Sequence, residues 1–379
     1  TCMDFNLTPD QIAFKKMAQE LVAKEITPYI REMDEKSEMR PGLIQKFHEA
    51  GILNLVVPEE YDGPGLDALS IALIYEELGK GCAGIATSAA ANALASYPVV
   101  VAGTEEQKRK MFDTINDGKL AAFALTEPNA GSDAGGVSTS ATRDGEYYVL
   151  NGTKCFITNG GISDIYTVFA NARKSAGIRG LTAFIVDRNT PGFSVGKKED
   201  KMGMRPSNTT ELILDNVRVH ESMRIGREGE GFKIAMKTLD AARPLVGAVG
   251  VGLADAALQA ACKYAKERQQ FGKPIASFQL VQGMIADMAM AVETARLMVY
   301  KACWLKDQGK DYKLESAMAK CLAADVAMKV TTDAVQIMGG YGYMKEYPVE
   351  KMMRDAKLLQ IYEGTNQIQR LVVANSILY

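Results

Sequence analysis

Histidine and cysteine are scarce in this chain, and their placement leaves little room for metal or disulfide chemistry. The only histidines are His48 and His220, and the six cysteines, at positions 2, 82, 155, 262, 303 and 321, include no Cys-x-x-Cys pair. Structural and catalytic zinc sites draw on clustered Cys and His ligands, so we expect no metal site. Without a recognisable disulfide framework, the cysteines suit a reducing compartment.

The chain also lacks an excess of charge of one sign and a long apolar run. Lys and Arg total 44 against 46 Asp and Glu, a formal net charge of -2, and no basic block or acidic tail is present. Nucleic acid and membrane surfaces are therefore not expected as partners. No uninterrupted apolar run approaches the roughly 20 residues of a membrane span, and no signal or transit peptide is visible around Met3. We expect a cytoplasmic protein in a bacterium, or a mitochondrial matrix protein in a eukaryote.

The hydrophobic pattern changes twice along the 379 residues, which predicts two or three packed units. Residues 1–122 follow a helical period and begin with the N-cap signal Thr8-Pro9-Asp10. Residues 123–228 hold short β-type runs, with a hairpin expected at Asp144-Gly145. Residues 229–379 return to the helical period. We expect an α+β fold with an N-terminal α-helical domain, a middle antiparallel β-domain and a C-terminal four-helix bundle.

Two segments near strands carry residues that could bind a flat cofactor. The first, residues 123–134, reads F-A-L-T-E-P-N-A-G-S-D-A where the helical unit gives way to strands. Its backbone amides and hydroxyls could bond the edge of a heterocycle or approach a phosphate, although a plain surface turn has the same composition. The second, residues 156–161, reads F-I-T-N-G-G and adds an aromatic face and a hydroxyl at a strand end. The pair Gly250-x-Gly252 lies inside a helical pattern and is therefore no dinucleotide fingerprint.

A carboxylate, Glu363, stands directly before Gly364 where an apolar helix comes to an end. Two interpretations fit it: a solvated charge at a helix end, or a catalytic base held against a substrate. A glycine-rich segment lies upstream at residues 336–343, Q-I-M-G-G-Y-G-Y, and its glycines could simply terminate a helix. Each of these patterns taken alone leaves both a structural and a functional interpretation open.

Two long motifs together resemble one enzyme family. Residues 124–136, A-L-T-E-P-N-A-G-S-D-A-G-G, are similar to the first signature of the acyl-CoA dehydrogenases, and residues 336–355, Q-I-M-G-G-Y-G-Y-M-K-E-Y-P-V-E-K-M-M-R-D, are similar to the second. They stand in the family's order and spacing, and the resemblance covers essentially the whole chain. It implies an FAD enzyme that acts on acyl-CoA thioesters as a homotetramer, a dimer of dimers.

The resemblance places FAD between the β-domain and the C-terminal bundle. Thr126 and Thr158 are implied to hydrogen-bond the flavin edge. Phe156 stands where other members often carry Trp, which keeps the aromatic wall and loses the indole N–H. Further FAD contacts are implied for Phe123, Leu125, Gly131, Ser132, Ile157, Thr365, Asn366 and Gln367. Contacts to pyrophosphate and adenosine, which in the family reach a neighbouring subunit's cofactor, correspond to Arg268, Phe271, Gln279, Gln336, Ile337, Gly339 and Gly340.

Glu363 matches the family's catalytic base. A thioester α-proton is too weakly acidic for a free carboxylate, so the carbonyl oxygen must be polarised as enolate charge develops. The family uses the backbone N–H of the base and a ribityl hydroxyl of FAD for this, and burial makes the glutamate more basic. Loss of the Cα proton and of a Cβ hydride to flavin N5 then gives trans-2-enoyl-CoA. Ser132, Asp240, Arg243 and Gly364 match substrate-contacting positions, although Arg243 could instead pair with Asp240.

The sequence gives weaker indications of the chain length of the substrate and of the direction of the reaction. Residues 87–94 correspond to the far end of the family's acyl pocket, and they carry small side chains and no arginine. This favours a short- to medium-chain neutral acyl group over a dicarboxylic one, although the alanines could merely let two helices pack closely. The family's electron acceptor is electron-transfer flavoprotein. Three alternatives stay open. One is an enoyl-CoA reductase that runs the reaction in the reverse direction, with or without an electron-bifurcating flavoprotein. The others are an acyl-CoA oxidase and a non-catalytic acyl-CoA-binding protein.

Overall fold

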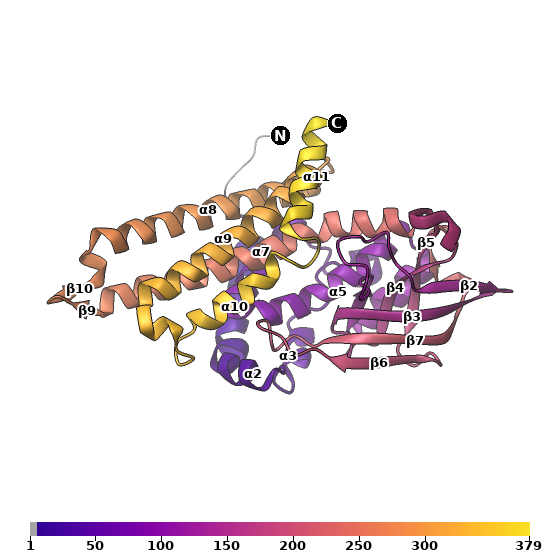
Figure 1. Ribbon diagram of the computed structural model, residues 1–379, viewed down its shortest axis with the longest axis horizontal. Coiled ribbons are helices and arrows are strands. Elements are labelled where there is room, and N and C mark those ends of the chain that lie inside the picture. Colours follow the sequence, from indigo (N-terminus) through magenta and orange to yellow (C-terminus); the bar gives the residue numbers. More distant parts are fainter. Residues whose placement is uncertain (1–5) are drawn as a thin grey trace.

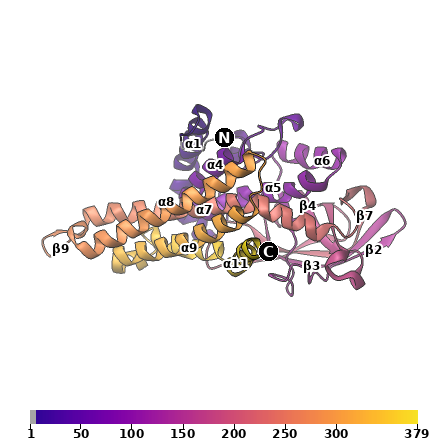
Figure 2. The same cartoon turned by 90° about the horizontal axis from the view of Figure 1, so that it is seen from above.

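The computed structural model describes residues 6–379, so Cys2 and Met3 lie outside the described residues. Helices occupy the chain up to Asn116, strands follow from Ala121 to Ile225, and helices return from Gly231 to Leu378. The sheet and the long helical bundle extend to opposite ends of the molecule, and the N-terminal helices cover one side of their junction (Figures 1 and 2). The expected α+β fold is confirmed.

The N-terminal unit is built from six α-helices and short connecting turns. They are α1 (Pro9–Leu21), α2 (Ile30–Lys36), α3 (Leu43–Glu49), α4 (Ala68–Gly81), α5 (Ala83–Ala102) and α6 (Glu105–Asn116). The predicted N-cap of α1 is confirmed. The Thr8 hydroxyl accepts a hydrogen bond from the Gln11 N–H, and the Gln11 side chain accepts one from the Thr8 N–H. This reciprocal capping box satisfies amides at the helix start that would otherwise lack partners.

The middle unit is a single sheet with the strand order β6-β7-β3-β2-β4-β5-β8 and with β1 beside β4. Its strands are β1 (Ala121–Ala124), β2 (Ser140–Asp144), β3 (Tyr147–Thr158), β4 (Ile165–Asn171), β5 (Leu181–Asp187), β6 (Phe193–Lys198), β7 (Thr209–His220) and β8 (Arg224–Ile225). The predicted hairpin joins β2 to β3, and Gly145 in its turn has a φ of 60°.

One feature of the predicted β-domain is wrong, because the sheet is mixed rather than antiparallel throughout. β1 pairs with β4 in parallel, and Ser140 of β2 pairs with Asn171 of β4 in the same sense. A parallel pair needs a long connection, and here the β2–β3 hairpin lies between β1 and β4. The remaining strand pairs are antiparallel.

The C-terminal unit is dominated by three long helices that run along one another (Figure 1). These are α7 (Gly231–Glu267), α8 (Gln279–Asp307) and α9 (Lys313–Met338). The small hairpin β9 (Gln269–Gln270) and β10 (Lys273–Pro274) connects α7 to α8 at the far end of the bundle. Two shorter helices, α10 (Val349–Leu359) and α11 (Asn366–Leu378), pack on α9. The segment between α10 and α11 carries Glu363.

Close helix packing joins the bundle to the N-terminal unit. Gly252 lies where α7 meets α4, and a Cβ atom at this position would come within 1.9 Å of the Glu76 carbonyl oxygen. The side chain of Glu76 is buried and accepts hydrogen bonds from Arg296 Nε at 3.0 Å and the Tyr300 hydroxyl at 2.8 Å, both on α8. Gly252 lies inside α7, as its helical sequence pattern predicted, and its lack of a side chain allows the close contact with α4.

Two helices, α5 and α7, are long and apolar enough to cross a membrane by length and composition alone. In each, most of the apolar window is buried within the protein, 72% for α5 and 67% for α7. Both helices contribute to the core that joins the three units, and this burial accounts for their apolar character.

Candidate active site

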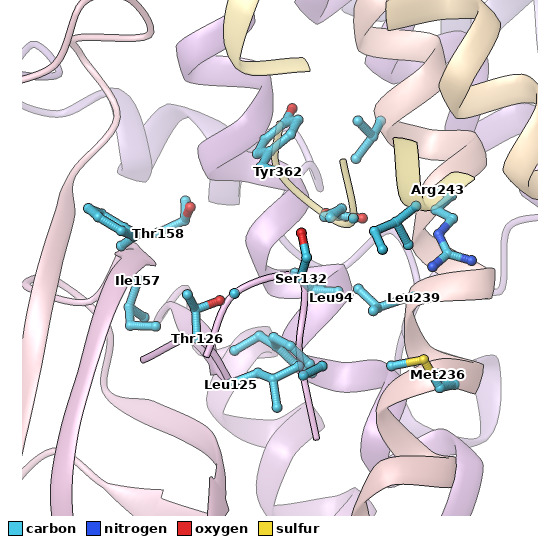
Figure 3. A pocket seen from close by; sticks show the side chains of 18 of the residues that line it. Leu94, Leu125, Thr126, Ser132, Ile157, Thr158, Met236, Leu239, Arg243 and Tyr362 are labelled. Atoms are coloured by element: carbon cyan, nitrogen blue, oxygen red, sulfur yellow. The ribbon is translucent and has the colours of Figure 1, made fainter. Parts of the chain in front are cut away.

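A cavity of about 430 Å³ lies where the sheet, α5, α7 and the segment before α11 meet. In Figure 3, Thr126 and Thr158 from the sheet side face Met236 and Arg243 of α7, with Tyr362 above the space between them. The cavity brings together eleven of the residues that the sequence assigned to the site. They are Phe123, Leu125, Thr126, Gly131, Ser132, Phe156, Ile157, Thr158, Arg243, Glu363 and Gly364.

The loop that follows β1 is fixed at its base by Glu127. This carboxylate accepts hydrogen bonds from the N–H groups and hydroxyls of Ser138 and Thr139 and pairs with Lys154 Nζ at 2.7 Å. Both charged side chains are buried, and Lys154 also donates to the Leu125 carbonyl at 3.1 Å. Burial opposes ionisation of Glu127, but Lys154 and the hydroxyl donors outweigh it and lower the pKa of Glu127 to about 2. The loop therefore presents its glycine and hydroxyl groups to the cavity from a rigid base.

A β-bulge turns Phe156 toward the open side of the sheet. The pairing of β3 with β7 shifts register between Lys154 and Ile157, and Phe156 has a φ of 58°. Its side chain is 64% exposed while the neighbouring Cys155 and Ile157 are buried. Bulges of this kind redirect a side chain, and a left-handed φ is unusual for a bulky residue. An aromatic face and the hydroxyl of Thr158 are thereby placed on the same cavity wall, which fits a flat cofactor.

Glu363 lies on the cavity wall in a left-handed backbone segment. Its φ is 52° and that of Gly364 is 88°. Gly364 suits this conformation because it has no Cβ, and a Cβ there would come within 2.6 Å of the Gln369 side-chain nitrogen. At Glu363 the same conformation is strained, a condition that concentrates at functional sites. The Glu363 Oε2 atom is buried and has no hydrogen-bond partner among the residues that the structure describes.

The carbonyl groups around Glu363 are held from α9 and α11. Lys320 Nζ on α9 donates to the Gly364 carbonyl oxygen at 2.8 Å and to Asn366 Oδ1 at 3.1 Å. Gln369 Nε2 on α11 donates to the carbonyl oxygens of Glu363 at 3.2 Å and Gly364 at 3.0 Å. These donors stabilise the strained turn from the side opposite the cavity.

The residues after Gly364 also help to hold the turn that carries Glu363. Thr365 caps α11, its hydroxyl accepting a hydrogen bond from the Ile368 N–H. The Asn366 side chain is buried and donates to the Cys321 carbonyl and to Asp325 Oδ1. Gln367 is exposed. FAD contacts from these three residues stay a prediction, because none of them lines the cavity of this chain.

Burial raises the pKa of Glu363 to about 7, and the cations Lys320 and Arg243 only partly offset this effect. Lys320 itself is fully buried, which lowers its pKa to about 8. A carboxyl group poised near neutral pH is suited to accept a proton in catalysis. Of the two interpretations that the sequence left open, a solvated helix-end charge does not fit this environment.

Of the two contacts considered for Arg243, the structure shows the pairing with Asp240. Its side chain lines the cavity, and its Nη1 donates to Asp240 Oδ1 at 2.6 Å. Only the pairing with Asp240 is a contact of this structure, and Asp240 does not line the cavity. The Arg243 Nε atom is buried without a partner among the described residues, so this donor is not used by the protein there.

The second group of predicted cofactor residues lies along the bundle, away from the cavity of the same chain (Figure 1). Phe271 in the β9–β10 turn is 93% exposed, and with Gln279 it borders a separate surface hollow that Ile337 also lines. Arg268 stacks over the Tyr341 ring at 5.2 Å. Gln336, Ile337, Gly339 and Gly340 occupy the C-terminal end of α9 and the turn after it.

Several cavity residues escaped the sequence analysis. On α7 they are Phe232, Met236, Leu239, Val246 and Val249, which share one face with Arg243 at spacings of three and four. That helical period could have identified them once Arg243 was assigned. The sequence gave no indication that Lys320 is buried beside the site, since a lysine in a helix is usually solvated.

Tyr362 was also missed, although it adjoins Glu363 in sequence. Its hydroxyl lies 3.1 Å from Thr87 Oγ1 on α5. Thr87 lines the cavity together with Ala90, Ala91 and Leu94, so the stretch that the sequence singled out on α5 does form a cavity wall.

A cavity between a β-domain and a helical bundle, walled by hydroxyls and an aromatic ring, has the character of a cofactor-dependent enzyme site. Its wall also carries a carboxylate whose buried Oε2 has no partner among the described residues. Sequence comparison agrees with this class. The N-terminal, middle and C-terminal domains of acyl-CoA dehydrogenase match residues 8–119, 122–217 and 229–378. The chain belongs to the acyl-CoA dehydrogenase family and is an FAD-dependent oxidoreductase.

Relatives are similar over nearly their full lengths. A short-chain-specific acyl-CoA dehydrogenase of Megasphaera elsdenii is 50% identical, with 99% of this chain and 100% of the relative covered. An acryloyl-CoA reductase (NADH) of Anaerotignum propionicum is 45% identical over 99% of this chain and 96% of the relative.

Solved structures are equally similar. Butyryl-CoA dehydrogenase from Megasphaera elsdenii has 49% identity and a TM-score of 0.97, with both chains fully covered. A chain from a structure of the electron transferring flavoprotein of Acidaminococcus fermentans, concerned with flavin-based electron bifurcation, has 51% identity and a TM-score of 0.97 over 99% of this chain and 100% of that one.

Proposed function

We propose that this enzyme removes two hydrogens from a short- to medium-chain acyl-CoA to give trans-2-enoyl-CoA, with Glu363 as the base that takes the α-proton. The observation that carries the proposal is the Glu363 carboxylate, which lines the cavity with a buried Oε2 that lacks a hydrogen-bond partner among the described residues. A pKa of about 7 lets this group accept a proton near neutral pH.

The backbone of the base can assist the same step. Within residues 6–379, no acceptor is found for the N–H of Glu363, so this group is free to donate to a thioester carbonyl oxygen. A donor directed at the oxygen where enolate charge develops lowers the barrier to α-proton removal. The donors from Lys320 and Gln369 hold the carbonyls of the same turn and thereby keep the peptide groups oriented.

FAD supplies the hydride acceptor of the reaction when it is bound. Thr126 and Thr158 are proposed to bond the edge of its ring system, and Phe156 to cover one of its faces. Gly131 fits this arrangement, because a Cβ built on it meets no atom within 4 Å and the loop faces open space. Ser132 and Arg243 are proposed to contact the CoA moiety.

The acyl group is proposed to lie between Glu363 and the wall formed by α5 and α7. Small or apolar side chains such as Ala90, Ala91 and Val249 line this part of the cavity, which suits a neutral chain. We expect best turnover on a short- or medium-chain saturated thioester in a panel of acyl-CoAs. Preferred turnover of glutaryl-CoA would contradict this assignment.

The distal residue group is proposed to complete the cofactor site of a second copy of this chain. The β9–β10 hairpin, which carries Phe271 and directly follows Arg268, lies at the end of the bundle away from the sheet (Figure 1). The exposed Phe271 ring needs a partner to be shielded from water. We therefore propose a homotetramer, a dimer of dimers. Its proposed location is the cytoplasm of a bacterium or the mitochondrial matrix of a eukaryote. Light scattering on the purified enzyme tests the assembly, and a monomer that retains FAD would contradict it.

Electron-transfer flavoprotein is the proposed electron acceptor, in keeping with the relative found in the Acidaminococcus flavoprotein structure. The reverse reaction, reduction of a 2-enoyl-CoA, is a second candidate because one relative is an acryloyl-CoA reductase. Anaerobic assays with saturated and unsaturated thioesters of equal length, each with a suitable electron acceptor or donor, decide the direction.

The test of the base is a single substitution. The purified enzyme should be yellow, and anaerobic butyryl- or octanoyl-CoA should bleach its flavin band. Glu363→Gln should retain FAD and bind the thioester but lose nearly all bleaching, because the amide cannot accept the α-proton. Bleaching at the normal rate in this variant would place the base elsewhere, and a colourless protein that cannot take up FAD would favour a non-catalytic binding protein.

A further inference from the structure

Lys320 is a buried cation beside the turn that carries Glu363, and its hydrogen bond to the Gly364 carbonyl does not account for its positive charge. Its side chain is fully buried within α9, and no carboxylate of the described residues lies within ion-pairing distance of its Nζ. The Nζ instead donates to the Gly364 carbonyl and to Asn366 Oδ1. A buried charge without a paired carboxylate is costly, so an apolar residue would serve the core better.

The other buried lysines among the described residues show the contrast. Lys154 pairs with Glu127 at 2.7 Å, and Lys351 pairs with Asp355 at 2.5 Å. In both cases a carboxylate in direct contact neutralises the charge of the lysine. Lys320 has no such contact among the described residues, so its charge can favour the ionised form of nearby acidic groups.

The charged groups around Lys320 come from three elements. Glu363 faces it from the turn between α10 and α11, Arg243 from α7, and Asp325 and the Cys321 thiol from α9 itself. Asp325 is already bound by Arg370, Gln360 and Asn366. Glu363 is thus the carboxylate of this neighbourhood that has no hydrogen-bond partner for its buried oxygen.

The groups that face the Glu363 carboxyl are few. Lys320 and Arg243 favour its ionised form, with Lys320 the stronger influence. The hydroxyls of Tyr97 on α5 and of the adjacent Tyr362 also lie close enough to be affected by its charge. Arg243 is engaged with Asp240 at 2.6 Å, which neutralises part of its effect.

We propose that Lys320 is a positioning residue for the proposed base, which clamps the Gly364 carbonyl and supplies a buried positive charge that favours the ionised form of the Glu363 carboxyl group. The inference rests on the proposed role of Glu363 as the base. The clamp and the charge are separate contributions, and they can be removed separately.

Three substitutions separate them. Lys320→Met removes both the charge and the donor, Lys320→Gln removes the charge and keeps a donor for the carbonyl, and Lys320→Arg keeps the charge. Lys329→Met is the matched control, because Lys329 lies on the same helix with an exposed side chain paired to Asp333.

The first readout is the pH profile of anaerobic flavin bleaching by butyryl-CoA, measured in rapid mixing on each holoenzyme. We expect the midpoint of the rising limb to lie near pH 7 in the wild type and to move upward by on the order of one pH unit in Lys320→Met and Lys320→Gln. Lys320→Arg and Lys329→Met should keep the wild-type midpoint. A uniform loss of rate without a shift in the midpoint would mean that Lys320 is only structural, and it would overturn the proposal.

The second readout does not depend on turnover. Infrared difference spectra taken across the same pH range follow the carboxyl band that disappears in Glu363→Gln, and its titration should move upward with loss of the Lys320 charge. If neither this titration nor the bleaching midpoint moves, the inference fails while the role of Glu363 can still stand. If the infrared titration moves and the bleaching midpoint does not, the proposed base is wrong, and with it the positioning role. Lys320→Gln carries the test if Lys320→Met does not fold.

Discussion

Replacing Glu363 by Gln should change how the stability of the protein depends on pH. The pKa of Glu363 is about 7 in the folded protein against an ordinary value of 4.5, because burial penalises the charged form. A carboxyl group with a raised folded-state pKa binds its proton more tightly in the folded protein. Its contribution to stability is therefore fully present below the unfolded-state pKa and is lost as the pH rises through 7.

The size of the effect follows from the two pKa values. Each pKa unit of difference corresponds to about 1.4 kcal/mol, so the wild type should lose about 3 kcal/mol of unfolding free energy between pH 4.5 and pH 7 through this group alone. Gln at the same position has no proton to release. The variant should therefore gain about 3 kcal/mol over the wild type across that interval.

Urea unfolding, followed by circular dichroism at several pH values between 4.5 and 7, measures this difference. FAD must be held at one saturating concentration, since a ligand that binds the folded state adds to its stability. Glu346→Gln is the control, because Glu346 is exposed and its removal should leave the pH dependence unchanged. A constant difference between wild type and Glu363→Gln across the pH range would refute the burial of this carboxyl group.

Two further predictions concern the elements that hold the site. Glu127→Gln leaves Lys154 buried without a counter-charge, and we expect a loss of about 3–5 kcal/mol in chemical unfolding. The double variant Glu127→Gln/Lys154→Met should regain much of it, because the glutamine side chain keeps an acceptor for the Ser138 and Thr139 donors, and a single variant as stable as the wild type would contradict the argument. Gly252→Ala places a methyl group against the Glu76 carbonyl and should cost at least about 1–3 kcal/mol, whereas Gly283→Ala, which meets no atom within 4 Å, should not destabilise the protein.

The order of the domains and the identity of many site residues could be predicted from the sequence, because they depend on local pattern and on motifs. Residues on one continuous loop, such as Thr126 and Ser132, were found in this way. The exposed orientation of Phe156 could not be found, because it depends on a register shift between two strands that are distant in sequence. The parallel pairing of β1 with β4 escaped for the same reason.

Lys320 shows the limit of sequence reasoning more sharply. Its burial depends on how α9 packs against the turn after α10, and that packing has no local signature. Glu363, the proposed base, was identified through a motif, but the motif alone could not show that its Oε2 is buried without a partner among the described residues. Tertiary burial, rather than residue type, determines the chemistry of both side chains.

A glutamate and a buried lysine lie near each other in two places of the protein, and the pKa of the glutamate moves in opposite directions in the two. Glu127 and Lys154 are in direct contact, and the pKa of Glu127 falls to about 2 despite its burial. This carboxylate cannot accept a proton at neutral pH and can only hold a loop. Lys320 acts on Glu363 without such a contact within the described residues, since its Nζ is bound to the adjacent carbonyl and to Asn366. Burial then prevails, and the pKa of Glu363 stays at about 7. A direct ion pair at this position would give a better anchored turn and a weaker base, so the indirect arrangement is the one that the proposed proton abstraction requires.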